Sequence, residues 1–326
     1  MFLLCSDLHL SDRPKDEYRF GIFRWLAKQQ AKYSPEATFI LGDLTQDKDN
    51  HSSTLVNRTI DELTTLQPPV YILRGNHDGL DPNNPFFKFL NCIDGIYFVI
   101  EPETIFGKVA MIPHCNTQEQ FNAACEAIKF RPDALMLHQT IAGAIAETGR
   151  PLNGFSASPI EALKPARCFA GDVHKPQIVG PVTYIGAPYQ VRFGDDFIGR
   201  VLLTKGEKDQ NLYYPYPHKW TLRIRDAGEI HQNTNLKAGD QVKLVIELAR
   251  EEMSEWATHK RKALDVCKEL GLEVFGVDVD VKNTTQKARK EAIKQGKSKT
   301  EIVTQFCVNE KVSAKIKETG LKLLGD

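Results

Sequence analysis

Three short apolar segments near the start of the chain each end in a cluster of polar residues. The segments and the clusters that follow them are 2–6 with Asp7-Leu8-His9, 37–41 with Gly42-Asp43, and 69–73 with Arg74-Gly75-Asn76-His77-Asp78. Apolar runs of this length favour strands buried on both faces of a sheet, and helical periodicity is expected over 18–33 and 53–66 between them. This alternation predicts a parallel α/β sheet that gathers the three polar clusters at one edge.

The middle third of the chain predicts a second sheet. Residues 134–137 and 168–170 are apolar and end in His138 and in Gly171-Asp172-Val173-His174. Short strands are also expected within 97–113, 182–185 and 200–204, and a helix over 118–128. The predicted fold is therefore α/β, with two sheets face to face and helices outside, a four-layer α-β-β-α sandwich in which both sheets supply residues to one crevice.

The residues at these strand ends are suited to binding metal ions. The set is Asp7, His9, Asp43, Asn76, His77, His138, Asp172 and His174. One Asp-x-His triplet is most often a solvated turn, but polar clusters after successive buried strands are not explained in that way. Carboxylate, carboxamide and imidazole ligands together suit two neighbouring Mn²⁺, Fe²⁺ or Zn²⁺ ions, which can bind a phosphate ester between them.

Composition narrows the class of protein. A chain of 326 residues with 41% hydrophobic residues predicts a folded protein of two domains, and its formal net charge is zero. The seven cysteines form no C-x-x-C pair, which favours buried thiols in a reducing compartment. With no signal peptide and no long apolar run, we expect a soluble, cytoplasmic protein without membrane contact, in the host cytoplasm if the source is viral.

In this order, the five motifs resemble those of the calcineurin-like metallophosphoesterases over about residues 1–205. The resemblance implies two divalent metal ions, with Mn²⁺ favoured and Mg²⁺ as an alternative. It assigns one ion to Asp7, His9, Asp43 and His174, and the other to Asp43, Asn76, His138 and Asp172. His77, held by Asp78, would be the catalytic residue that assists the leaving oxygen.

Asp172 departs from the pattern of that family, which usually has Gly-His-x-His where this chain has Gly171-Asp172-Val173-His174. A carboxylate in place of an imidazole predicts a stronger preference for Mn²⁺ or Mg²⁺ and weaker zinc binding. The alternative is that the second ion is weakly held and binds only together with substrate.

Two further stretches favour a DNA nuclease. Residues 184–194 and 135–140 are similar to segments of the Mre11 and SbcD nuclease subunits, especially of their phage homologues. The stretches 42–47 and 75–78 argue against a protein phosphatase. The expected function is a manganese-dependent 3′–5′ exonuclease and single-strand endonuclease of a DNA repair and recombination complex. Gln46, where some relatives have a histidine, leaves the balance of the two activities open.

The back half of the chain fits the same resemblance. We expect a catalytic domain over 1–205, a DNA-capping-like β-α-β domain over 206–282 with its helix over 251–270, and a basic linker with docking helices over 283–326. The helices would bind a coiled-coil ATPase similar to Rad50 or SbcC, and a homodimer is expected through 53–66 or 83–90. Candidate DNA contacts are Arg74, Arg192, Lys287, Arg289 and Lys290.

Two other functions stay open at this point. The Gly-Asn-His-Asp motif of residues 75–78 also occurs in cyclic-nucleotide phosphodiesterases, so a hydrolase of small phosphodiesters is one alternative. A non-catalytic scaffold with the same fold is the other, although scaffolds of that kind typically lose metal ligands.

Overall fold

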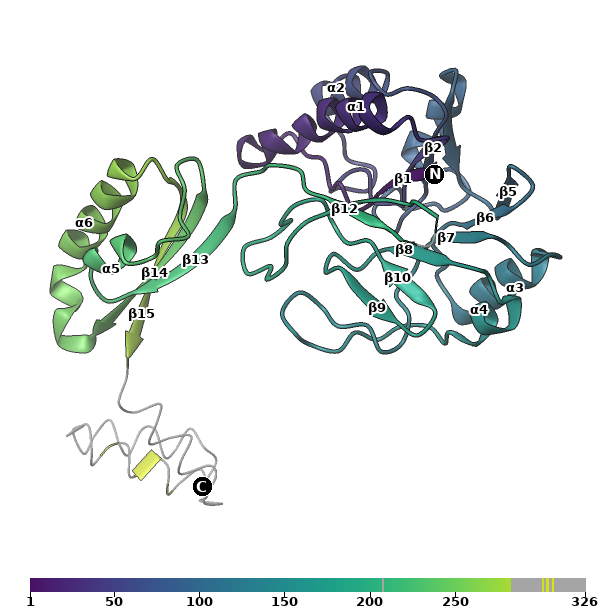
Figure 1. Ribbon diagram of the computed structural model, residues 1–326. Coiled ribbons are helices and arrows are strands. Elements are labelled where there is room, and N and C mark those ends of the chain that lie inside the picture. The colour runs from purple at the N-terminus through teal and green to yellow at the C-terminus, as the bar shows by residue number, and fades with distance from the viewer. Residues whose placement is uncertain (207, 283–300, 302, 305–306, 308–326) are drawn as a thin grey trace. The chain divides into compact units, whose positions relative to one another are not determined.

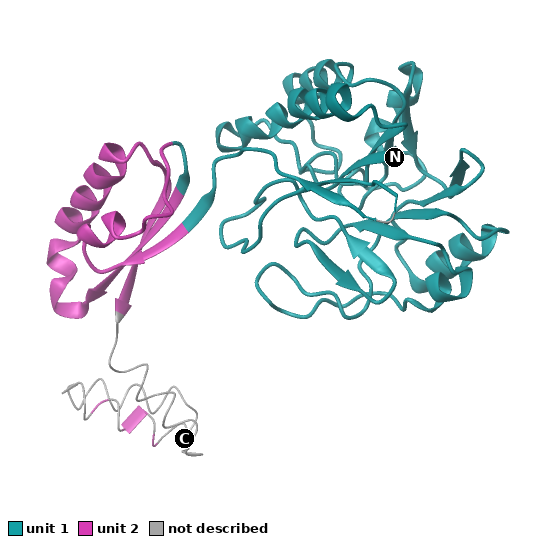
Figure 2. Ribbon diagram, in the orientation of Figure 1, with its two compact units in different colours: residues 1–220, 239–241 teal, residues 221–238, 242–326 magenta. Residues whose placement is uncertain are grey.

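The structure, a computed structural model, describes residues 1–206, 208–282, 301, 303–304 and 307. The chain packs into two compact units (Figure 2). Met1–Trp220 and Gly239–Gln241 form the first unit, and the other described residues belong to the second. The polar strand ends that the sequence singles out all lie in the first unit.

Sheet 1 of the first unit has six strands in the order β12-β11-β1-β2-β3-β4. They are β1 (Phe2–Cys5), β2 (Ala37–Ile40), β3 (Val70–Leu73), β4 (Ile96–Val99), β11 (Val201–Leu203) and β12 (Gln210–Leu212). Strands β1 to β4 are parallel, whereas β11 is antiparallel to both β1 and β12. The helical connections are η1 (Pro14–Phe20), α1 (Gly21–Tyr33), α2 (Ser53–Leu63) and η2 (Phe86–Cys92), of which η1 and η2 are 3₁₀ helices.

Sheet 2 repeats this plan in the order β5-β6-β7-β8-β10-β9. Its strands are β5 (Glu103–Ile105), β6 (Val109–Ile112), β7 (Ala134–His138), β8 (Cys168–Gly171), β9 (Gln177–Val179) and β10 (Val182–Tyr184). The inner strands β6, β7, β8 and β10 are parallel, and the edge strands β5 and β9 are antiparallel to their neighbours. Helices α3 (Gln118–Ala127) and α4 (Ser158–Leu163) precede β7 and β8.

The two sheets lie face to face, with helices outside both (Figure 1). Buried residues of both sheets fill the space between them, including Leu4 and Phe39 from sheet 1 and Met136 and Phe169 from sheet 2. A second buried cluster joins the outer face of sheet 1 to α1 and α2, and a third joins sheet 2 to α3 and α4. These are the four layers expected from the sequence, and the predicted fold class is confirmed.

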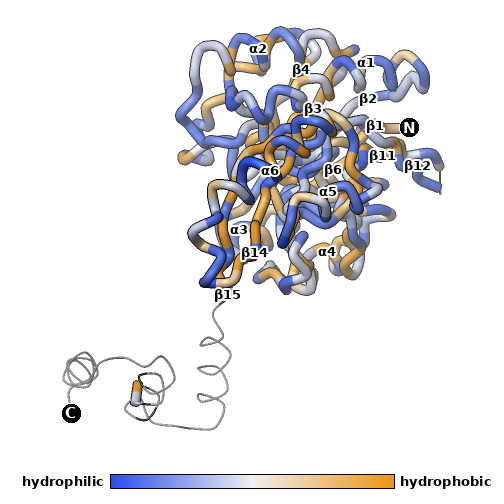
Figure 3. Tube along the Cα trace, turned by 90° about the vertical axis from the view of Figure 1, so that its left-hand side faces the viewer, coloured by the Kyte–Doolittle hydropathy of each residue, from blue (hydrophilic) through white to orange (hydrophobic). Residues whose placement is uncertain are grey.

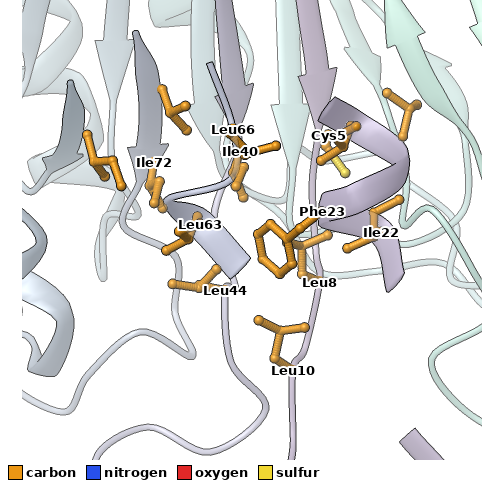
Figure 4. Packing of buried hydrophobic residues seen from close by; sticks show 14 of the residues in the cluster. Cys5, Leu8, Leu10, Ile22, Phe23, Ile40, Leu44, Leu63, Leu66 and Ile72 are labelled. Carbon is orange, nitrogen blue, oxygen red and sulfur yellow. The ribbon is translucent and has the colours of Figure 1, made fainter. Parts of the chain in front are cut away.

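Strand β1 shows why its sequence is apolar throughout. Side chains alternate between the faces of a strand, so Leu3 and Cys5 point toward the helices while Leu4 points toward sheet 2. Cys5 lies beside Ile22 and Phe23 of α1 in the outer core (Figure 4). Since both faces are covered, no position in β1 after Phe2 is exposed, and the first polar side chains appear where the strand ends.

The second unit is built on a sheet with strand order β13-β14-β15. Its elements are α5 (Gly228–His231), the 3₁₀ helix η3 (Arg250–Glu255), α6 (Trp256–Glu269), β15 (Glu273–Lys282), and all but the first residues of β13 (Lys219–Ile224) and β14 (Gln241–Ala249). Strand β14 is hydrophobic over much of its length (Figure 3), and Val242, Leu244, Ile246 and Leu248 are buried. Ile230 of α5 and Cys267 of α6 are buried as well.

Most expected strands are observed, but two helices begin later than predicted. The helix expected over 18–33 starts at Gly21, because Pro14 opens a separate 3₁₀ helix that runs to Phe20. The helix expected from residue 251 starts at Trp256. The residues before it form the 3₁₀ helix η3, which is stabilised at its start because the side chain of Glu252 accepts a hydrogen bond from Ala249 N.

The expected basic linker and docking helices fall almost wholly on residues outside those described, including Lys287, Arg289 and Lys290. The predicted boundary at residue 205 lies between β11 and β12, which pair with each other inside the first unit. Among the described residues, no helix has the length and apolar character that crossing a membrane requires. All seven cysteines are free, and only Cys92 is exposed.

Candidate metal centre

The polar residues at five strand ends meet at one place in the first unit. Asp7 and His9 follow β1, Asp43 follows β2, and Asn76 and His77 follow β3, while sheet 2 contributes residues that end β7 and follow β8. Contacts between the sheets join them: Nδ1 of His138 lies 2.6 Å from Leu41 O, and Asp172 N donates to Asp7 Oδ1 at 3.1 Å. The convergence predicted from the sequence is therefore present.

Four of these residues adopt a left-handed backbone conformation that non-glycine residues rarely occupy. The φ angles are 54° at Asp7, 45° at His9, 54° at Asp43 and 80° at Asp172. This conformation costs each non-glycine residue of order 1 kcal/mol or more in conformational free energy. It persists where the surrounding structure enforces it. The backbone thus turns sharply at each strand end.

The first ligand cluster contains Asp7, His9 and His174, which are all buried. One ligand atom from each lies within 4.8 Å of the others, and Nε2 of His9 is only 3.0 Å from Nε2 of His174. Burial lowers the pKa of His9 well below its usual value, and the nearby His174 and His77 lower it further. His9 is consequently neutral, and a neutral imidazole has a lone pair to offer a cation.

The second ligand cluster surrounds Nε2 of His138. Three side-chain oxygens approach this atom: Asp43 Oδ1 at 3.4 Å, Asn76 Oδ1 at 3.4 Å and Asp172 Oδ1 at 3.7 Å. The carbonyl of Leu41 can only accept a hydrogen bond, so Nδ1 of His138 carries the proton in that contact. Burial lowers the pKa of His138, but the carboxylates of Asp43 and Asp172 outweigh that effect and raise it to about 9. A cation bound among the three oxygens would take the place of the proton on Nε2.

Asp43 connects the two clusters. Its Oδ1 lies 3.4 Å from His138 Nε2, whereas its Oδ2 lies 3.5 Å from His9 Nε2. Gly75 lies against this carboxylate so closely that a Cβ there would overlap Asp43 Oδ1. Since one oxygen faces each cluster, a single carboxylate is placed to bridge two ions.

The donor atoms fit divalent cations. Two nitrogen ligands at right angles, each about 2.1 Å from an ion, would be about 3.0 Å apart, which matches the observed separation of His9 and His174. Burial raises the pKa of the Asp43 carboxyl, and the carboxylates of Asp78 and Asp7 raise it further against the opposing effect of His138. A bound cation would offset the cost of keeping these buried carboxylates ionised.

His77 lies beside both clusters, but its partner is not the expected one. Its Nδ1 is 2.7 Å from the carbonyl of Gln46, and its backbone N donates to Asp43 Oδ1 at 2.9 Å. The carboxylate of Asp78 instead accepts hydrogen bonds from three backbone amides: Asp43 at 2.9 Å, Leu44 at 2.8 Å and Gly75 at 2.6 Å. The expectation that Asp78 holds the His77 ring is therefore wrong. Asp78 fixes the turns after β2 and β3.

Sequence reasoning missed two residues next to the first cluster. Glu147 Oε1 lies 3.4 Å from Nδ1 of His174, and the guanidinium of the buried Arg19 donates to the carbonyl of His9. The neighbouring His174 lowers the pKa of Glu147 to about 2, so this carboxylate is ionised. Neither residue belongs to a strand-end motif, and only the position of Arg19 within an otherwise amphipathic stretch could have drawn attention to it.

The candidate DNA contacts differ in accessibility. Arg74 is 6% exposed, and its guanidinium donates to the carbonyl of His114. Arg192 is exposed, in the loop where Asp195 accepts hydrogen bonds from the amides of Val191 and Arg192. His114 lies two residues after the end of β6, and its ring centroid is 6.0 Å from that of His138, so a sixth strand also leads to the centre.

Comparison with known proteins gives one finding that bears on this centre. A family model described as calcineurin-like phosphoesterase matches residues 1–176, which include every strand-end residue described above. A search of curated proteins finds no match to the chain.

Proposed function

The chain belongs to the calcineurin-like phosphoesterase family, and on that premise we propose that it is a manganese-dependent DNA nuclease related to the Mre11 and SbcD subunits. Proteins of this family typically bind two divalent metal ions. The observation that carries the proposal is Asp43, whose two oxygens face the two ligand clusters. Two ions in those clusters would activate a water molecule and balance the charge that develops on a phosphodiester.

The chain's own residues have distinct tasks in this reaction. Asp7, His9 and His174 would hold one ion, Asn76, His138 and Asp172 would hold the other, and Asp43 would contribute one oxygen to each. The Gln46 carbonyl orients the His77 ring through Nδ1, which leaves Nε2 to act on the substrate. In its protonated form, His77 stabilises the charged phosphate and delivers a proton from Nε2 to the leaving 3′ oxygen.

A segment that resembles nuclease subunits supports DNA as the substrate. Residues 184–194 carry this resemblance, and they lie against the metal centre: Tyr189 OH donates to Leu8 O at 2.5 Å, and Arg19 donates to Val191 O at 2.8 Å. The same segment contains the exposed Arg192, whose positive charge acts on Glu147. Arg192 is consequently the described candidate best placed to meet a DNA phosphate near the first cluster.

The test compares three substrates with Mn²⁺ present: linear duplex DNA, circular single-stranded DNA and a cyclic nucleotide. We expect cleavage of both DNAs, with mononucleotides released from 3′ ends of the duplex. A clear preference for the cyclic nucleotide would instead identify a hydrolase of small phosphodiesters. The variant D43A should abolish cleavage and H77A should slow it strongly. Unchanged cleavage in both would mean that the centre described here is not the active site.

The proposal extends to partners. By the same resemblance, residues 300–324 would bind a coiled-coil ATPase similar to Rad50 or SbcC, and two copies of the chain would associate through 53–66 or 83–90. Leu80 and Phe89, which are 73% and 37% exposed, are apolar side chains at or beside the second of these segments. Sedimentation of the chain alone and with such an ATPase tests both statements, and removal of residues 300–326 should abolish only the second association.

A further inference from the structure

Thr140 makes a short hydrogen bond to the one residue that departs from the family's metal-binding pattern. Its Oγ1 donates to Asp172 Oδ2 at 2.6 Å. Strands β7 and β8 are parallel neighbours in which His138 pairs with Gly171, so the residues just beyond both strand ends are adjacent. The register of sheet 2 therefore places a hydroxyl next to the carboxylate that replaces an imidazole.

This contact leaves the two oxygens of Asp172 in different roles. Oδ2 is occupied by the Thr140 hydroxyl, whereas Oδ1 lies 3.7 Å from Nε2 of His138. The backbone of Asp172 is fixed as well, because its N donates to Asp7 Oδ1 and its φ is 80°. Held at the backbone and at one oxygen, the side chain presents only the other oxygen to the second cluster.

We propose that Thr140 is a positioning residue that makes Asp172 a single-oxygen metal ligand and so makes the second cluster selective for Mn²⁺ or Mg²⁺ over Zn²⁺. The inference rests on the two-metal function proposed above and specifies it further. A carboxylate free to rotate could bind one ion through both oxygens and fill two coordination positions. With Oδ2 held by Thr140, one position stays open for a phosphate oxygen of the substrate.

The two clusters consequently differ in chemistry. The first offers two imidazole nitrogens, from His9 and His174, whereas the second offers one nitrogen from His138 and three oxygens. Imidazole ligands suit Zn²⁺, whereas oxygen ligands suit Mn²⁺ and Mg²⁺. The selectivity assigned to Thr140 therefore applies to one ion of the pair.

The experiment measures Mn²⁺ binding to the full chain by electron paramagnetic resonance and calorimetry, without substrate. T140V and T140A both remove the hydroxyl but differ in shape, and T140S retains it. We expect one of two Mn²⁺ sites to weaken by about 10- to 100-fold in T140V and T140A, as is typical when an outer-shell partner of a metal ligand is lost. T140S should bind both ions as the wild type does.

A matched control tests whether any threonine-to-valine change has the same effect. Thr59 is buried and its hydroxyl donates to Leu55 O at 2.7 Å within α2, so T59V removes a comparable hydrogen bond away from the metal centre. T59V should keep both Mn²⁺ affinities. In a D172A background, T140V should cause no further loss, because Thr140 acts through Asp172.

Zinc binding distinguishes selectivity from simple damage to the site. We expect T140V to lose Mn²⁺ affinity at the second cluster while Zn²⁺ affinity there changes less. The inference would be overturned if T140V lost equal affinity for Mn²⁺ and Zn²⁺ or lost affinity for neither ion. It would also be overturned if T140S lost as much affinity as T140V. These outcomes are independent of the substrate: DNA cleavage that requires Asp43 and His77 would still support the proposed nuclease if Thr140 had no effect.

Discussion

The carboxylate of Glu147 lies 3.4 Å from Nδ1 of His174, whereas the other ring nitrogen of His174, Nε2, faces His9. The two nitrogens of one imidazole thus have different partners, a carboxylate on one side and the first ligand cluster on the other. A carboxylate in this position orients a ligating histidine and raises its basicity as a ligand. Glu147 is therefore placed to act on the candidate metal centre through His174.

The first prediction concerns this pair. E147Q should weaken the first metal site by about 10- to 100-fold, because it removes the negative charge that lies 3.4 Å from Nδ1 of His174. Calorimetric titration with Mn²⁺ checks this. E161Q, at an exposed position of α4, serves as the control, and equal affinities in the two variants would show that Glu147 does not act on His174.

The second prediction concerns the number of bound ions. D43A should lose both ions, since each oxygen of Asp43 faces one cluster, whereas D172A should lose only the ion beside His138. Metal analysis after gel filtration in Mn²⁺ gives the stoichiometry directly. D196A, an exposed aspartate variant, should retain both ions. Retention of one tight ion in D43A would contradict a bridging role.

The third prediction separates catalysis from metal binding. H77A should retain both Mn²⁺ ions yet cleave phosphodiesters about 10² to 10⁴ times more slowly, the usual contribution of a positioned general acid or base. Single-turnover cleavage under saturating Mn²⁺ measures the rate, and metal analysis of the same sample measures occupancy. If H77A lost its ions, His77 would be a ligand instead.

The fourth prediction concerns Lys219, which is 4% exposed. Its Nζ donates to Gln241 Oε1 at 2.6 Å and lies 3.7 Å from Asp16 Oδ1. Burial and the nearby Arg19 together lower the pKa of Lys219 from its usual 10.5 to about 8, against the opposing effect of Asp16. Between those two values the unfolded chain binds more protons than the folded chain, so stability rises with pH.

K219M should lack that rise. Over pH 8 to 10.5, the free energy of unfolding of the wild type should increase relative to K219M by no more than about 1.4 kcal/mol per pH unit. Urea unfolding at several pH values in this window measures the difference. Parallel pH profiles for the two proteins would show that Lys219 is not held with a lowered pKa.

The layers of the fold were predictable because the strands are short and covered on both faces. In β1, every position after Phe2 is buried, so burial appears in the sequence as an unbroken apolar run. The polar residues that follow such runs had to meet at one edge, because parallel strands connected by helices all end on the same side. Asp7, Asp43 and His138 could thus be identified from their positions alone.

Residues that act through contacts distant in the sequence were not predictable. Glu147 lies in the long segment between β7 and α4, where no periodicity indicates which side chain turns inward. The partner of Asp78 was misjudged because its hydrogen bonds run to backbone amides, which every residue possesses and no sequence motif marks. Such contacts depend on how two turns pack together in three dimensions.

Asp78 has a consequence for how activity measurements on this chain are interpreted. Its carboxylate accepts three hydrogen bonds from the turns that carry Asp43 and His77. Replacing it would let Asp43, the proposed bridging ligand, and His77, the proposed catalytic residue, move apart, and turnover should fall because the Asp78 carboxylate is bound to backbone amides. A mutational scan that measures only turnover would therefore place Asp78 among the residues that take part in the reaction. Its loss would instead lower turnover by freeing the backbone of the two turns.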